Sequence, residues 1–295
     1  MAASTIRILV SRHSAFYSPL ILTIAAGFLD KEKLAGTYGV LPKGRSARDL
    51  IRQGEVDVVQ AAVSSNWGPM ENGERDLPLH FAQINQRDGF FLAGRAADPS
   101  FHWKKLEGKT LLADHGGQPL VMLKYAAHHQ NVDWNKINVI DAGSIEEIDA
   151  AFRAGRGDYV HQQGPAPQQL EKEGIAHFVA SVGSSMPPVA FSSLMASREF
   201  LGTAQSKRFL SAYRKSREWA NKALPGEIAD AEASFFPNFD RKALSAAIAR
   251  YQSIGCWTGE LAITRDLYEQ ALEVFLYSGA IPRRYPYEEV VTEFS

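Results

Sequence analysis

The sequence has a single cysteine, Cys256, among its 295 residues. One cysteine excludes an internal disulfide and a metal site built from several thiolates. The sequence also lacks any run of Lys and Arg longer than two residues, and its net charge is −1. Because proteins that bind nucleic acid usually carry a strongly basic domain or stripe, nucleic acid is not an expected partner.

Long hydrophobic segments are also missing. The longest strongly apolar stretch, residues 19–29, is shorter than the roughly 20 residues that a membrane-spanning helix needs. It is not interpreted as a signal-peptide core, because a strand pattern precedes it at residues 6–10 and its apolar pattern continues to Leu34. We therefore expect no direct insertion into a membrane. The expected location is the periplasm if an export signal has been removed, and the cytoplasm otherwise.

The composition is that of an ordinary globular protein. Hydrophobic residues make up 45% of the chain and charged residues 22%, which is enough apolar material for one or two sizeable cores. Since compact domains usually have about 100 to 200 residues, the length predicts two domains.

One short segment occurs twice. Residues 52–59 and 153–160 share Arg, Gly, Asp and Val at the same spacing. Each copy follows a helical pattern that opens at a serine, Ser46 or Ser144, and each enters a strand pattern. Gly suits the left-handed residue after a helix, and Arg suits the negative end of the helix dipole. A strand–helix–strand unit that recurs about a hundred residues later predicts two similar α/β lobes.

Strand and helix patterns alternate along the chain, which predicts a mostly parallel sheet flanked by helices in each lobe. Crossovers between the lobes are expected near residues 90–98 and at the Gly-, Ser- and Pro-rich residues 183–188. The first lobe is then discontinuous, residues 1–95 and 188–295, and the second lobe, residues 96–187, is inserted into it. After Ser197 the pattern predicts extra C-terminal helices, at residues 205–223, 226–235, 241–255 and 264–278.

In open parallel sheets, ligands bind beyond the carboxyl ends of the strands, where helix N-termini also offer free N–H groups. The loops at these positions are small, polar and rich in hydrogen-bond donors, and they suit a carboxylate, a sulfonate or a polar heterocycle. The residues expected to contact the ligand are Arg12, His13, Ser14, Tyr17, Arg45, Ser46, Ser64, Ser65 and Asn66 in the first lobe, Asp114, Gly116, Gly117, Gln118, Ser144, His161 and Gln163 in the second, and Phe191 after it.

Catalytic and metal-binding patterns are absent from the sequence. There is no HExxH motif, no CxxC motif and no carboxylate-rich loop, so we expect neither a metal nor another cofactor. His13 follows the first strand, and three interpretations are open for it and for His161: ligand contact, structural residue, or acid–base catalyst. No third group that would orient a His13–Ser14 pair can be named, so no catalytic residue is assigned.

Four segments resemble the substrate-binding proteins of ABC importers, in the class that handles nitrate, sulfonates, taurine and thiamine-pyrimidine precursors. They are residues 17–29 with their GFL ending, LEGKT at 106–110, the GRGD segment through Pro165, and IPRRYPY at 281–287. The resemblance implies the type II periplasmic-binding fold, with two lobes that close on a small-molecule ligand about a two-stranded hinge and deliver it to a membrane permease. Gln163 stands where the family often has Trp, which implies a more polar pocket floor.

The resemblance also extends to enzymes. The alternative to ligand capture is a cytoplasmic enzyme on the same fold, a desulfinase, a decarboxylase or an enzyme like pyrimidine synthase, with His13 or His161 as acid or base. The pyrimidine synthase of this kind carries a cysteine cluster, and the desulfinase carries a cysteine nucleophile near the first strand, where this chain has His13 and Ser14. Capture without catalysis is therefore the expected function.

Overall fold

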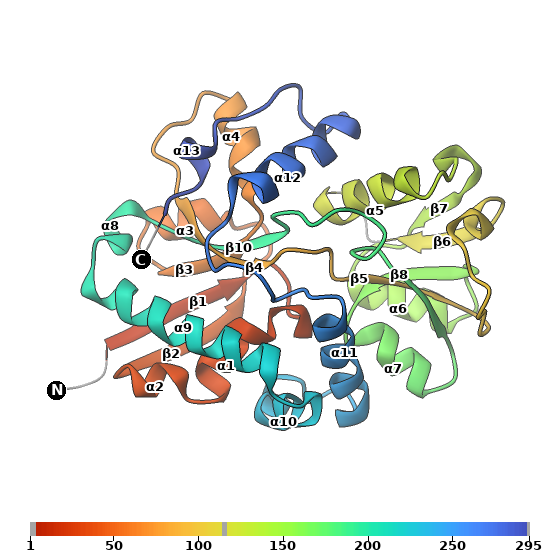
Figure 1. Cartoon of the computed structure of the whole chain (residues 1–295), viewed down its shortest axis with the longest axis horizontal. Helices are drawn as coiled ribbons and strands as arrows, with labels where there is room; N and C mark the ends of the chain where they lie inside the picture. The colour runs from red at the N-terminus through yellow and green to blue at the C-terminus, as the bar shows by residue number, and fades with distance from the viewer. Residues whose placement is uncertain (1–3, 114–116, 294–295) are drawn as a thin grey trace.

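Two five-stranded sheets lie side by side in the computed structural model, which describes residues 4–113 and 117–293 (Figure 1). The first sheet has the order β2 (Leu34–Val40), β1 (Ser4–Val10), β3 (Val58–Ala61), β10 (Ser192–Ala196) and β4 (Leu79–Asn85). The second has the order β7 (Asn138–Asp141), β6 (Thr110–Ala113), β8 (Tyr159–Gln163), β5 (Phe90–Gly94) and β9 (His177–Ser181).

The two sheets correspond strand by strand. In the first, β10 is antiparallel to both β3 and β4, so the other four strands all run the same way. In the second, β5 is antiparallel to both β8 and β9, with the same result. The predicted fold class of two α/β lobes with mostly parallel sheets is therefore confirmed.

The repeated segment occupies equivalent places in the two sheets. It follows α3 (Ala47–Arg52) in one and α6 (Ile145–Arg153) in the other, and it leads into the central strands β3 and β8. Gly54 and Gly155 both have positive φ, 68° and 87°, as a residue just past a helix end requires. Ser144 and Glu147 form the predicted capping box at the start of α6.

The chain crosses between the sheets twice, from Asn85 of β4 to Phe90 of β5 and from Ser181 of β9 back to Ser192 of β10. The Val189 N–H of the second connection donates to the Gln86 carbonyl of the first at 2.9 Å, so the two lie side by side, as the expected two-stranded hinge requires. β5 belongs to the second sheet, although its residues fall within the range 1–95 assigned to the first lobe. The boundaries of the compact lobes, at residues 96 and 187, stay a prediction.

The C-terminal helices cover both lobes. α9 (Ala204–Lys222) packs against α1 (Ser18–Ala25) and α2 (Phe28–Lys31) of the first lobe. α11 (Arg241–Ser253) contacts α7 (Ala166–Lys172) of the second lobe, and α12 (Arg265–Tyr277) lies beside α5 (Gly117–His129) (Figure 1). The remaining helices are α4 (Trp67–Glu71), α8 (Arg198–Leu201), α10 (Pro225–Ala231) and α13 (Tyr287–Val290). Within the described ranges, every helix is too short or too polar to traverse a bilayer.

Aromatic side chains fill the space next to the hinge. The Tyr251 ring of α11 packs against Phe16 at 5.2 Å between ring centroids and against Phe91 at 5.3 Å. Its hydroxyl accepts a hydrogen bond from the Gly164 N–H at 2.7 Å and donates to the Gly89 carbonyl at 3.2 Å. The Tyr251 side chain thus contacts three places at once: Phe16 after β1, Gly164 after β8, and Gly89 in the connection from β4 to β5.

Candidate ligand-binding site

Two adjacent cavities lie between the sheets, at the carboxyl ends of β1 and β8. Arg12 follows β1 and Gln163 ends β8, and both residues line both cavities. The smaller cavity, of about 40 Å³, is lined by Arg12, His13, Ser14, Ile145, Ile148, Gln162, Gln163, Gly164, Pro165, Ala166 and Phe239. The larger, of about 120 Å³, is lined by Ser11, Arg12, Tyr17, Gln60, Ala62, Phe90, Gln118, Pro119, Gln163, Phe191 and Ser192.

Gln60, at the carboxyl end of β3, shapes one wall of the larger cavity. Its Oε1 accepts hydrogen bonds from the Ser11 N–H at 3.0 Å and the Ser11 hydroxyl at 2.7 Å, and its Nε2 donates to the Ser192 hydroxyl at 3.3 Å. Tyr17 is fully buried beside this group, and burial raises the pKa of its phenol although Ser192 and the Arg12 charge act in the opposite direction. The wall therefore consists of neutral hydroxyl and amide groups.

His13 is held by the C-terminal part of the chain. Its Nε2 lies 2.7 Å from the Phe235 carbonyl oxygen, which can only accept, so Nε2 carries the proton. Its Nδ1 then accepts from the Tyr38 hydroxyl at 3.0 Å, and its ring stacks on Phe236 at 4.4 Å. Burial lowers the pKa of His13, so the imidazole is neutral and both of its nitrogens are occupied.

His161 lies in β8 but lines neither cavity. Its ring is fully buried and stacks on Phe90, with 4.5 Å between centroids. Phe90 in turn forms part of the wall of the larger cavity. His161 therefore supports an aromatic wall residue without lining the cavity itself.

Hydrogen bonds across the cleft hold the two lobes together. Ser64 donates to Gln118 Oε1 at 3.2 Å, and Gln118 Nε2 donates to the Phe191 carbonyl at 2.8 Å. On the other side, the Ser14 hydroxyl donates to the Gly164 carbonyl at 2.7 Å. Because both sides of the cleft are bridged, the structure shows a closed arrangement with room for a small ligand only.

The structure brings part of the expected contact set together. Seven of these residues line the two cavities: Arg12, His13, Ser14, Tyr17, Gln118, Gln163 and Phe191. Ser64 does not line a cavity, but its hydroxyl is hydrogen-bonded to the lining residue Gln118. Gly117 is the residue before Gln118, at the start of α5. Asp114 and Gly116 lie outside the described residues.

The other expected residues have local roles. Arg45 is exposed and pairs with Glu55 at 2.8 Å, and the serines Ser46 and Ser144 cap α3 and α6. The Ser65 hydroxyl lies 3.5 Å from the His80 ring, and the Asn66 amide donates to the Pro78 carbonyl at 2.9 Å. None of these five lines either cavity.

Several lining residues escaped the sequence analysis. Gln60 lies inside a strand, and Phe239 comes from the segment between α10 and α11. No local signal in the sequence marks either of these two positions.

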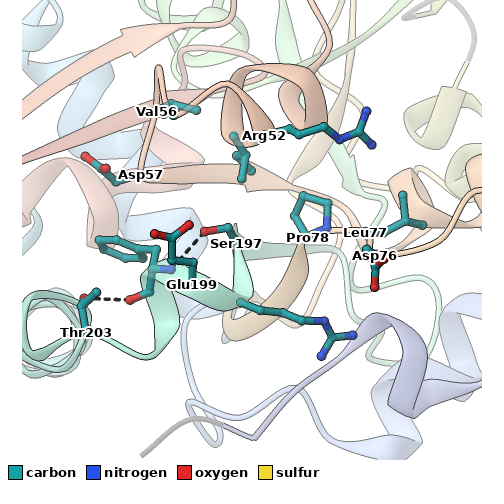
Figure 2. Close-up of a pocket in the computed structure, with 13 residues that line it drawn as sticks. Arg52, Val56, Asp57, Asp76, Leu77, Pro78, Ser197, Glu199 and Thr203 are labelled. Carbon is teal, nitrogen blue, oxygen red and sulfur yellow. Dashed lines mark hydrogen bonds between the residues drawn. The ribbon is translucent and has the colours of Figure 1, made fainter.

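A third and larger cavity, of about 560 Å³, is a groove at the opposite end of β3, between α3, residues 76–78 and α8. Figure 2 shows the Arg52 guanidinium directed away from the carboxylates of Asp57 and Glu199. Asp57 is already paired with Arg7 at 2.7 Å, and Arg52 lies 3.5 Å from the Asp49 carboxylate. We regard the cleft between the sheets as the candidate site, because polar groups of both lobes converge there.

Comparison with known proteins supports the fold. No protein-family model matches the chain. A protein of Bacillus subtilis (strain 168) named "Putative binding protein YtlA" is 27% identical over 285 residues, which cover 95% of this chain and 85% of that protein.

Two solved structures also match over nearly the whole chain. The ligand-binding component of an ABC-type import system from Staphylococcus aureus has a TM-score of 0.75 at 15% identity, covering 98% of this chain and 97% of its own. The periplasmic aliphatic sulphonate-binding protein SsuA from Escherichia coli has a TM-score of 0.75 at 13% identity, covering 99% and 93%. The chain has the fold of these binding proteins, and the resemblance inferred from the sequence is confirmed at that level.

Proposed function

We propose that this chain is a solute-binding protein, which captures a small polar organic molecule between its lobes without transforming it. The observation that carries the proposal is the position of Arg12 and Gln163. These side chains come from opposite sheets, and both line both cavities of the cleft. A ligand held there would contact both lobes at once.

Lobe closure would supply the affinity. A ligand shifts the population toward the closed state only as far as it binds that state better than the open one. In the closed state the ligand meets Gln60 and Tyr17 of the first lobe and Gln118 of the second within one enclosed space. An open state would offer only one of these two walls.

We further propose that the chain delivers its ligand to the permease of an ABC importer. This proposal is supported by the fold shared with the Staphylococcus aureus import component and with the Escherichia coli protein, which is periplasmic. The same likeness supports the periplasm as the location that we propose for the chain.

The surroundings of the two candidate histidines favour capture over catalysis. Both ring nitrogens of His13 are occupied, by the Tyr38 hydroxyl and the Phe235 carbonyl. His161 lines neither cavity. A general acid or base needs a nitrogen within reach of the reacting proton, and neither residue offers one in this arrangement.

A thermal-shift screen of nitrate, alkanesulfonates, carboxylates, carboxamides and pyrimidines tests the proposal. A ligand present at a hundred times its dissociation constant adds about 2.7 kcal/mol of stability. For a chain of this size, that raises the melting temperature by about 5 °C. The hit should be recovered unchanged after prolonged incubation. A screen in which no compound shifts the transition, or a hit that is converted to product, would refute capture.

A further inference from the structure

Gln162 holds an unusual position in the cleft. It lies on β8 two residues after Val160, so both side chains project from the same face of the strand. Val160 is buried in a small apolar cluster with Leu112, Ile148 and Phe152. The Gln162 amide therefore sits at the end of an apolar cluster, where it lines the smaller cavity.

Both polar atoms of this amide lack a partner among the residues that the structure describes. The Gln162 side chain is buried, with 3% of the residue exposed, and neither Nε2 nor Oε1 makes a hydrogen bond within the described part of the chain. In the larger cavity, by contrast, Gln60 and Gln118 each use both amide atoms. Buried amides are almost always hydrogen-bonded, so an unpaired one at a cavity wall indicates a missing partner.

We infer that the ligand carries a carbonyl oxygen next to an N–H group, as in a carboxamide, a lactam or a cyclic ureide, and that Gln162 binds this pair. The inference rests on the proposed function and narrows its ligand class. A carboxamide side chain presents one donor and one acceptor side by side, and another amide edge satisfies both at once. The amide of Gln162 could be built with its O and N positions exchanged. The inference would be the same, because neither atom has a partner among the described residues.

Acceptor-only anions fit this wall poorly. Nitrate or a sulfonate could accept from Gln162 Nε2 but would leave Oε1 buried and unpaired. Gln163 Oε1 is a second buried acceptor without a partner among the described residues, and it too requires a donor. The two unpaired acceptors, Gln162 Oε1 and Gln163 Oε1, therefore indicate a ligand that carries N–H groups.

The other walls agree with an uncharged amide group. Around Gln162, the smaller cavity has apolar sides formed by Ile145, Ile148, Pro165 and Phe239, and the segment after β1 with Arg12 and His13 forms the side opposite β8. An amide group needs no counter-ion against these apolar sides. With about 40 Å³, this cavity admits only the amide end of a ligand, and the remainder would occupy the 120 Å³ cavity next to it.

The test compares matched probes by calorimetry and thermal shift on the full chain. Propionamide, 2-pyrrolidinone and hydantoin carry the carbonyl and N–H pair, whereas propionate, methanesulfonate and nitrate are acceptors only. We expect a saturable shift with at least one amide probe and none with the anions. Gln162→Met, similar in volume, should weaken that binding at least tenfold and leave the melting temperature of the ligand-free protein equal or higher.

Gln252→Met is the matched control. Gln252 Nε2 donates to the carbonyls of Ala220 and Ala223 outside the cleft, so its loss should lower the melting temperature and leave the affinity unchanged. If the anions bind and the amides do not, or if the hits of a wider screen lack the carbonyl and N–H pair, the inference is wrong and capture stands. If Gln162→Met destabilises the protein without weakening binding, Gln162 is structural and the inference is again wrong. If no compound binds, capture itself fails.

Discussion

The hydroxyl of Ser14 donates a hydrogen bond to the carbonyl oxygen of Gly164 at 2.7 Å. Ser14 follows β1 of the first sheet, and Gly164 follows β8 of the second. The bond therefore spans the cleft beside the smaller cavity, and we expect it to break when the lobes open. Since ligand affinity depends on the stability of the closed state, this contact should contribute to binding by holding the lobes together.

Replacing Ser14 by Ala should weaken ligand binding about fivefold, the equivalent of one hydrogen bond of about 1 kcal/mol. Calorimetry with the best ligand of the screen measures the change. Ser211→Ala is the control, because Ser211 donates to Glu32 at 2.8 Å within the first lobe. Equal affinities for the Ser14 variant and the unaltered protein would show that the bridge does not stabilise the closed state.

Replacing Tyr251 by Phe should lower the free energy of unfolding by about 1–3 kcal/mol. The change leaves the buried N–H of Gly164 without its acceptor and removes the donor to Gly89. The ring contacts with Phe16 and Phe91 would remain. Urea denaturation measures the loss, and a variant as stable as the parent would mean that these groups find other partners.

The two aspartates of the repeat should differ in their importance for stability. Asp57 accepts from the Arg7 backbone N–H at 2.7 Å and from its guanidinium at 2.7 and 3.0 Å. Asp158 accepts at its side chain from the Thr110 N–H at 2.8 Å, in an exposed setting. We expect Asp57→Ala to cost about 2 kcal/mol and Asp158→Ala about 1 kcal/mol. Denaturation of both variants tests the order, and a larger loss for Asp158→Ala would contradict it.

The contribution of Glu232 to stability should fall as the pH rises from about 4.5 to 8. Burial raises the pKa of Glu232 to about 8, and Ser18 donates to its carboxyl at 2.9 Å. In this interval the folded protein retains a proton that the unfolded chain has lost, so ionisation favours unfolding. The slope from this group is about 1.4 kcal/mol per pH unit.

Glu232→Gln should remove this slope, because glutamine does not titrate. The variant should gain stability relative to the unaltered protein at pH 8 and show no such gain at pH 4.5. Urea denaturation at pH 4.5, 6 and 8 provides the measurement. Parallel curves for the two proteins would show that Glu232 is not neutral in the folded state.

Local sequence signals account for the parts of the fold that were predicted correctly. The helix before the second copy of the repeat was predicted from a capping box and an Arg–Gly ending, and α6 has both. Such signals act over a few residues, so they can be recognised without knowing the partners of the segment. β5 and β10 gave no such signal, because strands buried on both faces do not alternate between apolar and polar residues.

The sequence by itself determined that strand–helix–strand units are repeated and that polar loops follow several strands, because capping, turn and periodicity rules act within a few residues. Only the tertiary structure decided which of those loops face the cleft. Arg45 turns to Glu55, while Gln60 and Gln162 reach the cavities from within strands. The direction of a side chain depends on strand pairing and on neighbours far away in the chain, and the packing of the two lobes sets both.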